Sequence, residues 1–156
     1  MLIRRFASKD AQSCCDVINS CVPSMAGLNQ AARFYVLSKN IPSDFIADIG
    51  NTFALVAELH RQIVAVGTLD GDTIRRLYVC PDIQGKGVGQ AMMEALEKEA
   101  RKRDVAMLRV EVAPSAIDFY EKMGYVQKGM THSEIGKAVF EYMQMTKELK
   151  GHSAAV

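Results

Sequence analysis

The segment from Gln84 to Gln90 combines the residue types and the spacing of a phosphate-binding loop. Glycine occupies every second position and one lysine stands among the glycines, in the order Gln84, Gly85, Lys86, Gly87, Val88, Gly89 and Gln90. Glycine can adopt positive φ and leaves no Cβ between the backbone amides and a ligand. A helix that begins at such a loop directs its free N–H groups and the positive end of its dipole at one place, where a phosphate group is stabilised.

The spacing of these glycines excludes two common phosphate-binding motifs. A P-loop needs Ser or Thr after its Gly-Lys pair to bind magnesium, but Gly87 follows Lys86 here. A dinucleotide-binding fingerprint needs Gly-x-Gly-x-x-Gly, and the alternation of Gly85, Gly87 and Gly89 does not fit it. The structural alternative to a phosphate site is a turn that only starts a helix.

A predicted strand before the loop and a predicted helix after it place the glycines where a phosphate site needs them. The strand spans Thr73–Val79. After the loop, apolar residues recur at helical spacing, namely Val88, Ala91, Met92, Ala95, Leu96 and Ala100. Acid-first i,i+4 pairs such as Glu97–Arg101 favour the same helix. A further strand is predicted over residues 106–112, with Glu111 on the face opposite its apolar residues.

Two elements of the sequence resemble signatures of the GNAT acetyltransferase superfamily. Gln84, Gly87 and Gly89 match its Gln/Arg-x-x-Gly-x-Gly/Ala pattern, and the segment Ala116–Tyr125 closely resembles its Ala-x-x-Phe-Tyr-Glu-Lys-x-Gly-Phe element. The two elements lie in the family's order, and together they cover roughly residues 72–126. The resemblance implies that the loop binds the pyrophosphate of acetyl-coenzyme A and that the preceding strand follows the pantetheine arm.

The resemblance also implies chemical roles. Acetyl transfer to an amine requires a polarised carbonyl, loss of a proton from the amine and protonation of the leaving thiolate. In relatives a backbone N–H of the fourth strand, here near Val79, polarises the carbonyl, and Tyr120 matches the tyrosine that protonates the sulfur. A neutral phenol suits this donor role. The structural alternative is a tyrosine that only packs in a core.

The general base is not determined by the sequence. Glu111, near the end of a strand beside the cofactor, is the first choice. Glu58, Asp72 and a water chain are the alternatives, and Thr73 stands where some relatives carry a glutamate. Cys80 offers a covalent acyl-cysteine route, but the family usually transfers directly, so direct transfer is expected.

One position departs from the family pattern. Ala113 replaces the asparagine that contacts pantetheine in many members, and Ser115 is the expected substitute contact. The departure concerns this contact and leaves the expected fold unchanged. The residues expected to contact the cofactor are Leu77, Tyr78, Val79, Gln84, Gly85, Lys86, Gly87, Val88, Gly89, Gln90, Ser115 and Tyr120.

Length and composition limit the size of the core and the kinds of partner that the chain can have. A chain of 156 residues with 49% hydrophobic content is large enough for one core. A net charge of +1, from 19 basic and 18 acidic residues, gives no electrostatic case for nucleic-acid binding. Without an 18-residue apolar run or a signal-peptide pattern, we expect no membrane association and a cytoplasmic location. The four cysteines and three histidines lack metal-ligand spacing, so no metal is expected.

The predicted elements follow the order β-α-α-β-β-β-α-β-α-β-β. This is the order of a GNAT fold of the α/β (α+β) class, with a mixed sheet of about seven strands and four or so helices on both faces. Residues 1–148 are expected to form one acetyltransferase domain, and residues 149–156 a frayed tail. A break is expected over 41–44, and the last two strands over 126–131 and 137–146.

The expected function is acetyl-CoA-dependent transfer of an acetyl group to a primary amine. The acceptor, a small molecule or a peptide or protein amine, stays open because fold does not determine substrate. The segment Pro23–Ile49 is expected to shape the acceptor pocket. The alternative function is a non-catalytic coenzyme A-binding sensor or interaction module, which Ala113 and the undetermined base motivate. The resemblance also implies that the chain can form a homodimer.

Overall fold

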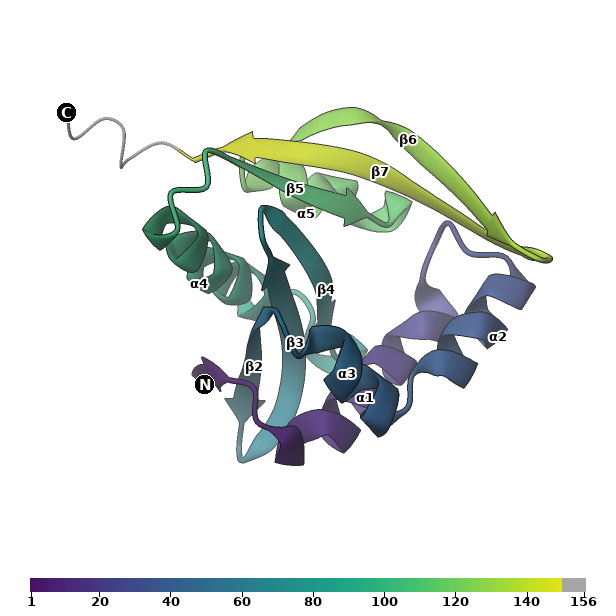
Figure 1. Cartoon of the computed structure of the whole chain (residues 1–156), viewed down its shortest axis with the longest axis horizontal. Helices are drawn as coiled ribbons and strands as arrows, with labels where there is room; N and C mark the ends of the chain where they lie inside the picture. The colour runs from purple at the N-terminus through teal and green to yellow at the C-terminus, as the bar shows by residue number, and fades with distance from the viewer. Residues whose placement is uncertain (150–156) are drawn as a thin grey trace.

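The computed structural model describes residues 1–149, which form a seven-stranded mixed sheet with helices on both faces (Figure 1). The strands are β1 (Leu2–Arg5), β2 (Phe53–Leu59), β3 (Gln62–Asp70), β4 (Thr73–Val79), β5 (Met107–Val112), β6 (Val126–Ile135) and β7 (Ala138–Glu148). The α-helices are α1 (Ala11–Cys21), α2 (Gln30–Lys39), α3 (Pro42–Ile49), α4 (Val88–Lys102) and α5 (Ile117–Lys122). The expected α/β class with a mixed seven-stranded sheet is confirmed.

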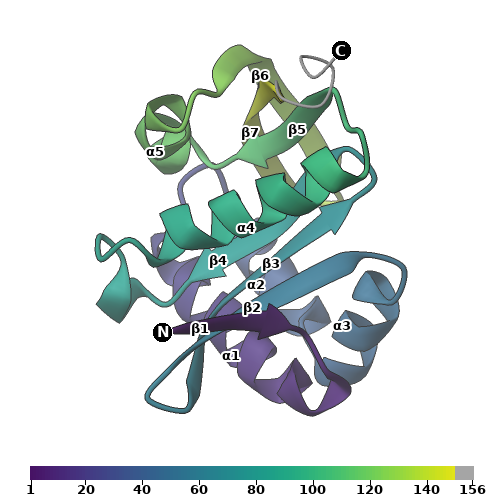
Figure 2. The same cartoon turned by 90° about the vertical axis from the view of Figure 1, so that its left-hand side faces the viewer.

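The strands lie in the order β1-β2-β3-β4-β5-β7-β6. Neighbouring strands are antiparallel except β4 and β5, which run parallel. Helices α4 and α5 cover one face of the sheet, α1 and α3 cover the other, and α2 lies against β7 (Figure 2). In β5, for example, Leu108, Val110 and Val112 face the core beneath α4, whereas Arg109 and Glu111 point to the opposite face.

Two segments differ from the expectation. The predicted break over 41–44 is wrong, because α3 already begins at Pro42, with Ile41 as its extended N-cap. The first helical position does not need the N–H that proline lacks, so Pro42 starts this helix instead of interrupting it. The last two strands are longer than predicted, and reach Ile135 and Glu148, because β7 pairs with both β5 and β6.

The end of β7 is attached to α4 by a buried charge. Glu97 of α4 accepts hydrogen bonds from Lys147 Nζ at 3.0 and 3.2 Å and from the Tyr125 hydroxyl at 2.8 Å. A buried carboxylate needs such partners to offset its loss of hydration. Leu149 extends the attachment through a backbone hydrogen bond of 2.8 Å to the segment before β5, and residues 150–156 of the predicted tail lie outside the described residues.

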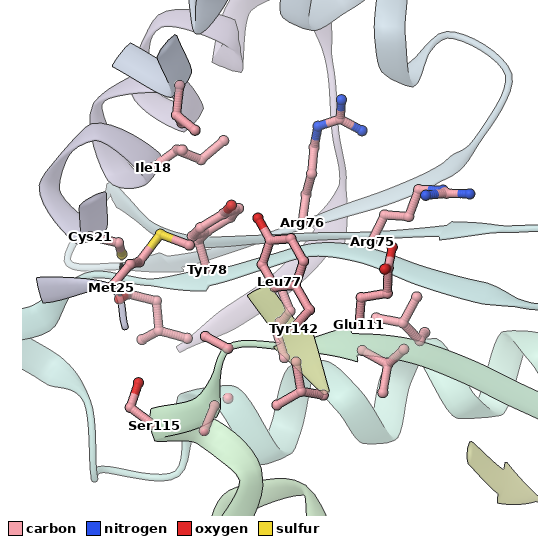
Figure 3. Close-up of a pocket in the computed structure, with 18 of the residues that line it drawn as sticks. Ile18, Cys21, Met25, Arg75, Arg76, Leu77, Tyr78, Glu111, Ser115 and Tyr142 are labelled. Atoms are coloured by element: carbon pink, nitrogen blue, oxygen red, sulfur yellow. Dashed lines mark hydrogen bonds between the residues drawn. The ribbon is translucent and has the colours of Figure 1, made fainter. Parts of the chain in front are cut away.

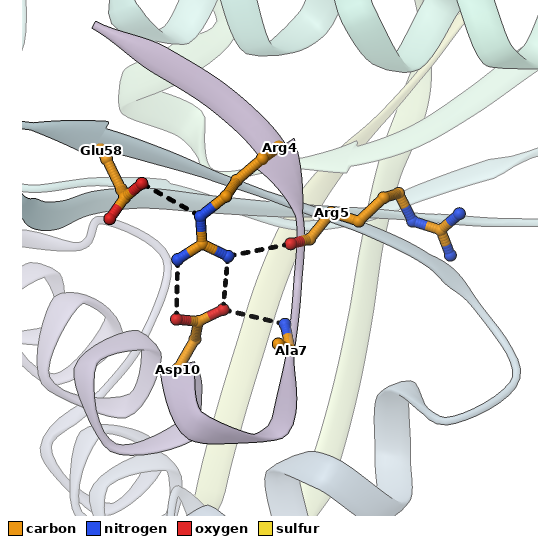
Figure 4. A network of polar contacts seen from close by, with 5 residues as sticks. All are labelled: Arg4, Arg5, Ala7, Asp10 and Glu58. Atoms are coloured by element: carbon orange, nitrogen blue, oxygen red, sulfur yellow. Dashed lines mark hydrogen bonds and ion pairs between the residues drawn. The ribbon is translucent and has the colours of Figure 1, made fainter.

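Arg4 joins β1 to the start of α1 and to β2 (Figure 4). Its guanidinium donates to both carboxylate oxygens of Asp10, at 2.8 and 2.9 Å, and to Glu58 at 3.0 Å. Asp10 also accepts a hydrogen bond from the Ala7 N–H at 2.8 Å. The hydrogen bonds from Arg4 hold the pKa of Asp10 below its usual value, although Asp10 is buried. The network fixes the N-terminal segment against the sheet.

Asp10→Asn is expected to lower the free energy of unfolding by about 2 kcal/mol at pH 7, since hydrogen bonds to charged groups contribute roughly that much. The pKa of Asp10 is lower in the folded chain than in the unfolded chain, where it is about 3.9. Its contribution is therefore complete above that pH and is lost as the pH falls below about 4. Urea denaturation from pH 7 to pH 3 should show the difference between wild type and variant shrinking with falling pH.

Asp16→Asn is the matched control, because Asp16 is exposed on α1 and its carboxylate bonds only to Gln12 among the described residues. It should change the free energy of unfolding by less than about 0.5 kcal/mol at every pH. Equal stability of Asp10→Asn and wild type at pH 7 would contradict the structural role of the Arg4 network.

Candidate functional site

The site is built where the parallel strands β4 and β5 separate. The two strands pair at two positions, Thr73 with Arg109 and Ile74 with Val110, which lie at the N-terminal end of β4 and in the middle of β5. Beyond these pairs the edge of β4 that faces β5 has no strand beside it among the described residues. Free backbone groups on a strand edge can form hydrogen bonds with an extended ligand.

A β-bulge in β4 accounts for this separation. Thr68 of β3 pairs with Arg75, but Val66 pairs with Tyr78, so β4 has one residue more than β3 between these points. Arg76, inside the bulge, adopts a left-handed φ of 53°. The buried hydroxyl of Thr68 donates to the Arg75 carbonyl at 2.8 Å and supplies a partner where the ladder is interrupted. Bulges bend a strand and increase its twist, which turns β4 away from β5.

The separated strands open a cleft of about 1180 Å³ (Figure 3). This volume suits a large ligand, since small-molecule pockets range up to about 1,000 Å³. Two expected contacts do not line the cleft: the Lys86 side chain is exposed and the Val88 side chain is buried in the core. The other expected residues line it, namely Leu77, Tyr78, Val79, Gln84, Gly85, Gly87, Gly89, Gln90, Glu111, Ser115 and Tyr120.

One end of the cleft is formed by the glycine loop and the first turn of α4. Gly85 and Gly87 have left-handed φ values of 82° and 86°, and Gly87 is the N-cap of the helix. The first α-helical hydrogen bond of α4 is donated by the Ala91 N–H to the Gly87 carbonyl, at 3.0 Å. No side chain caps the N-terminus of the helix. The N–H groups of Val88, Gly89 and Gln90 therefore precede the helical ladder and are available to an anion.

Gly89 has a different function from the other two glycines. A Cβ at this position would lie 3.3 Å from the ring of Phe119, so the absence of a side chain lets α5 pack closely against the first turn of α4. At Gly85 and Gly87, by contrast, an added Cβ would meet open space, and the left-handed backbone is what requires glycine. The loop thus depends on glycine for two separate reasons.

The carbonyl of Val79 fixes the end of β4. It accepts a hydrogen bond from the Gln84 side-chain amide at 2.9 Å and from the Cys21 thiol of α1 at 3.2 Å. Gln84, expected as a cofactor contact, therefore also holds the loop against the strand that precedes it. This bond keeps the open edge of β4 and the free amides of α4 in one fixed arrangement.

Tyrosine side chains line the cleft from β4, α5 and β7, namely Tyr78, Tyr120 and Tyr142. Figure 3 labels two of them, Tyr78 and Tyr142. The buried Tyr120 ring packs edge-to-face with Phe119 and Tyr125, with centroid distances of 5.0 and 5.5 Å. Burial, and to a smaller extent Tyr78, raises the pKa of Tyr120 above its ordinary value. Burial also raises the pKa of Tyr78 to about 12. Both phenols are therefore neutral hydrogen-bond donors near pH 7.

Tyr142 is a lining residue that the sequence did not reveal. Burial, with a smaller contribution from Glu111, raises its pKa. It pairs with Thr131, whose hydroxyl has two acceptors for its one proton, the Tyr142 carbonyl at 3.2 Å and the Glu111 carboxylate at 3.4 Å. No sequence signal could have found it, because the face of β7 that meets the cleft depends on a register between distant strands.

The segment Pro23–Ile49, expected to shape the acceptor pocket, supplies the other end of the cleft. Met25, Tyr35 and Phe45 line it, together with polar residues of α2 and α3. At this end Arg76 of the β4 bulge forms an ion pair of 3.2 Å with Asp48 of α3. The opening is therefore partly apolar and carries charges of both signs.

The candidate general bases differ in whether they line the cleft. Glu58 bonds to Arg4, and Asp72 forms an ion pair of 3.2 Å with Arg109; neither lines the cleft. A hydrogen bond from Thr73, and then Arg109, holds the pKa of Asp72 below its usual value. Among the acids considered from the sequence, only Glu111 lines the cleft.

Cys80 lies outside the cleft. It lines a separate cavity of about 500 Å³ that also contains Arg4 and Glu58. Burial raises the pKa of its thiol, which disfavours the nucleophilic thiolate. This position speaks against Cys80 as an acyl carrier.

Two further findings concern the described part of the chain. Within residues 1–149, no cluster of three or more His, Cys, Asp or Glu side chains is arranged to hold a metal ion. The helices of this part are too short or too polar to span a membrane.

Comparison with known proteins identifies the family. Residues 24–149 match the family model described as the acetyltransferase (GNAT) domain. The chain belongs to the GNAT acetyltransferase family. The resemblance of the loop and of the Ala116–Tyr125 element to GNAT signatures is thereby confirmed.

Curated relatives match this GNAT chain over a limited region. The [ribosomal protein bS18]-alanine N-acetyltransferase of Escherichia coli K12 is 43% identical over 60 residues, which are 36% of this chain and 40% of the relative. The uncharacterized N-acetyltransferase ycf52 of Porphyra purpurea is 33% identical over 55 residues, which are 35% of this chain and 32% of the relative. The chain thus matches about a third to two fifths of the length of these relatives.

Solved structures match over nearly the whole GNAT chain. A GCN5-related N-acetyltransferase from Rhodopseudomonas palustris has a TM-score of 0.87 at 27% identity, and the match covers 95% of both chains. An N-acetyltransferase from Thermoplasma acidophilum in complex with coenzyme A has a TM-score of 0.71 at 15% identity, covering 95% of this chain and 98% of the other. The second likeness shows the fold alone.

Gly87→Val is expected to weaken coenzyme A binding by at least about tenfold, since a β-branched residue at this left-handed φ displaces the amides around it. Gly136→Val is the matched control, because Gly136 also has a left-handed φ, of 59°, and an added Cβ there would meet open space in the β6–β7 turn. Calorimetric titration with coenzyme A should show loss of affinity only for Gly87→Val. Equal affinity in both variants would contradict the loop assignment.

Proposed function

We propose that this GNAT protein is an acetyl-CoA-dependent N-acetyltransferase that transfers the acetyl group directly to a primary amine. The observation that carries the proposal is the cleft between β4 and β5. It joins the free amides of α4 at one end to an acceptor opening under α1, α2 and α3 at the other. The buried hydroxyl-bearing residue Tyr120 lines this cleft.

The residues present fit acetyl-CoA. The N–H groups at the start of α4 would hold the pyrophosphate, with Lys86 as a nearby cation. The open edge of β4 at Leu77–Val79 would pair with the amide groups of the pantetheine arm, as an added strand would. Ala113 and Ser115 both line the cleft, so Ser115 would supply a side-chain contact where Ala113 offers none.

Bound acetyl-CoA supplies an activated thioester, and the protein moves two protons. A backbone N–H near Val79 polarises the acetyl carbonyl, because a fixed donor stabilises the charge that develops on its oxygen. Glu111, directly or through water, takes a proton from the amine as the new C–N bond forms. Tyr120 would give its hydroxyl proton to the sulfur as the C–S bond breaks, and its phenol is neutral near pH 7. Glu111 would then release the amine proton to solvent, and Tyr120 would regain a proton from solvent. Proximity supplies much of the remaining acceleration.

A non-catalytic coenzyme A sensor on the same fold is the second candidate. Ala113 at the position of the usual asparagine favours it, together with the exposure of Glu111. The two functions differ in one readout, since both bind coenzyme A but only the enzyme releases free thiol in the presence of an amine. The acceptor is a small-molecule amine or a peptide or protein amine; the E. coli relative is a ribosomal-protein alanine N-acetyltransferase.

The proposal includes a cytoplasmic location. The cysteines Cys14, Cys15, Cys21 and Cys80 are all free, as is usual for proteins of a reducing compartment. Cell fractionation of the tagged chain tests this location.

The proposal is tested first by titration with acetyl-CoA, coenzyme A and ATP in parallel, followed by a thiol-release screen of amines and peptides. Binding of both coenzyme A species but not of ATP, together with thiol release for at least one amine, is the expected result. Binding without thiol release for any amine would favour the sensor. Absence of coenzyme A binding would overturn both candidates.

Tyr120→Phe is expected to lower kcat by about 100-fold while leaving the affinity for acetyl-CoA within about threefold, because general acid catalysis contributes on the order of 10²–10⁴ and the ring packing is retained. Tyr125→Phe is the matched control: its hydroxyl bonds to Glu97 in the core, so its loss should lower stability but not turnover. Steady-state kinetics of thiol release measures both. Full activity of Tyr120→Phe would remove Tyr120 from the mechanism.

Glu111→Gln is expected to lower kcat/KM at pH 7 by about 100-fold through loss of the base. Asp72→Asn is the control, since Asp72 is ion-paired with Arg109 outside the cleft. The amine substrate identified by the screen is used for both variants. Unchanged kcat/KM in Glu111→Gln would show that water alone removes the amine proton.

A further inference from the structure

The bulge in β4 places two arginines side by side on one face of the sheet. Ile74 and Leu77 both pack into the core beneath α4. Side chains of a regular strand alternate between the two faces, so residues three positions apart share a face only where the strand has an extra residue. Arg75 and Arg76 lie between them on the opposite face, where Arg76 pairs with Asp48 of α3. Figure 3 shows both arginine side chains extending to the same side of β4.

Glu111 lies on this same face, at the point where β4 and β5 separate. The last pair of the parallel ladder joins Ile74 to Val110, so Arg75 and Glu111 are the next residues of their strands. The side chains of Arg75, Arg76 and Glu111 all line the cleft. Within residues 1–149, Glu111 forms no ion pair. An amine held at Glu111 therefore lies near two guanidinium groups that Glu111 does not neutralise.

Each of these arginines has unused hydrogen-bond donors. Arg75 Nε donates to Asp70 at 3.3 Å, and Arg76 Nη2 donates to Asp48 at 3.2 Å. A guanidinium carries five N–H donors, and neither side chain donates another hydrogen bond to the described residues. The two acids are exposed by 50% and 60%, and such exposed ion pairs are weak. A carboxylate of a ligand can therefore bind the planar fork of either arginine without breaking a strong interaction.

The backbone of Arg76 supports a function for its side chain. Four non-glycine residues of the described part have a left-handed φ, and Arg76, at 53°, is the one that lies inside a strand. This conformation costs free energy for a residue that has a Cβ, and glycine would avoid the cost. Strain of this kind is concentrated at ligand-binding and catalytic sites, where the surrounding structure maintains it.

We propose that the acceptor is a small amine that also carries a carboxylate, such as an amino acid. Its amine lies at Glu111, and its carboxylate is bound by Arg75 and Arg76. The inference rests on the proposed function and names the substrate class of the same site. Acetyl-CoA and the neutral amine give the N-acetyl product and the free thiol of coenzyme A, and the carboxylate is unchanged.

The other charges at this end of the cleft fit a zwitterion. Lys39 of α2 adds a third cation, and Asp44 lies one turn before Asp48 on α3; all three line the cleft. A ligand with both signs of charge finds an opposite charge for each of its groups. A polyamine or another polycation is disfavoured, because its additional positive charges would lie near Arg75 and Arg76.

Thiol release with matched pairs of acceptors tests the substrate class. The pairs are α-, β- and γ-amino acids and their carboxamides, at saturating acetyl-CoA. The kcat/KM of the best amino acid should exceed that of its carboxamide by at least about tenfold, since the carboxamide leaves the arginines without their anionic partner. Thiol release only with amines that lack a carboxylate, including polyamines and aminoalkyl phosphates, would support the proposed function but overturn this inference.

Arg76→Gln is expected to raise the KM of that amino acid by about tenfold or more, and to change the KM of its carboxamide by less than about threefold. Arg75→Gln should act in the same direction. Arg109→Gln is the matched control, because Arg109 lies on the same face of the sheet, two residues before Glu111, but does not line the cleft. It should change neither KM. Wild-type KM values in both cleft variants would overturn the inference.

Asp48→Asn distinguishes binding by Arg76 from a structural role. It removes the ion pair between α3 and β4 but leaves the Arg76 guanidinium in place. If Arg76 binds the carboxylate, the KM of the amino acid should stay the same or fall. If Arg76 only holds α3 against β4, Asp48→Asn should raise this KM as Arg76→Gln does, and that result would overturn the binding role. Circular dichroism of each variant verifies folding.

A binding measurement decides the inference if no acceptor releases thiol. The coenzyme A-loaded protein is then titrated calorimetrically with the same amino acids and carboxamides. Binding of an amino acid but not of its carboxamide, with loss of binding in Arg76→Gln, would keep the proposed ligand class on a non-catalytic sensor. No preference for the amino acid would overturn the inference. Absence of thiol release alone would overturn only the proposed function.

Discussion

The separation of β4 from β5 is the constraint on which the rest of the structure depends. Two parallel strands normally pair along their length, but here the pairing stops after Ile74 and Val110. The bulge at Arg76 bends β4, and the buried Thr68 hydroxyl satisfies the Arg75 carbonyl that the bulge would otherwise leave unpaired. Without this bond, the buried Thr68 hydroxyl would also have no partner, which is costly.

Residues of β4 on either side of this separation determine the two ends of the cleft. On one side, Gln84 and Cys21 hold the Val79 carbonyl, so the end of β4 is fixed against the first turn of α4. On the other side, Arg76 leaves the bulge toward α3 and pairs with Asp48. The same irregularity thus exposes the strand edge for an extended ligand and places a charge at the acceptor opening.

Local patterns of the sequence predict much of this arrangement. The bounds of β4 are Thr73–Val79 as predicted, and the glycine loop opens α4 as its apolar spacing requires. The predicted break over 41–44 is wrong because proline is well suited to the first turn of a helix, where its missing N–H is not needed. Such local features depend on residues close in the sequence.

The rest depends on contacts between distant residues, which a single sequence does not carry. Glu58 and Glu111 are both acids on strands, and only the partner of Glu58, Arg4 on another strand, shows that Glu58 belongs to a structural network. The position of Tyr142 follows from the register of β7 against β5 and β6. The β4 bulge likewise arises from the register in which β4 pairs with β3, and no residue type in β4 predicts it.

The central claim, that the open edge of β4 and the first turn of α4 together hold acetyl-CoA, is tested most directly by amide hydrogen exchange with and without this ligand. The account predicts slower exchange at Leu77–Val79 and Val88–Gln90, where the free N–H groups gain partners, and unchanged exchange in β1. Binding that leaves both segments unchanged, or that slows exchange only elsewhere, would contradict it.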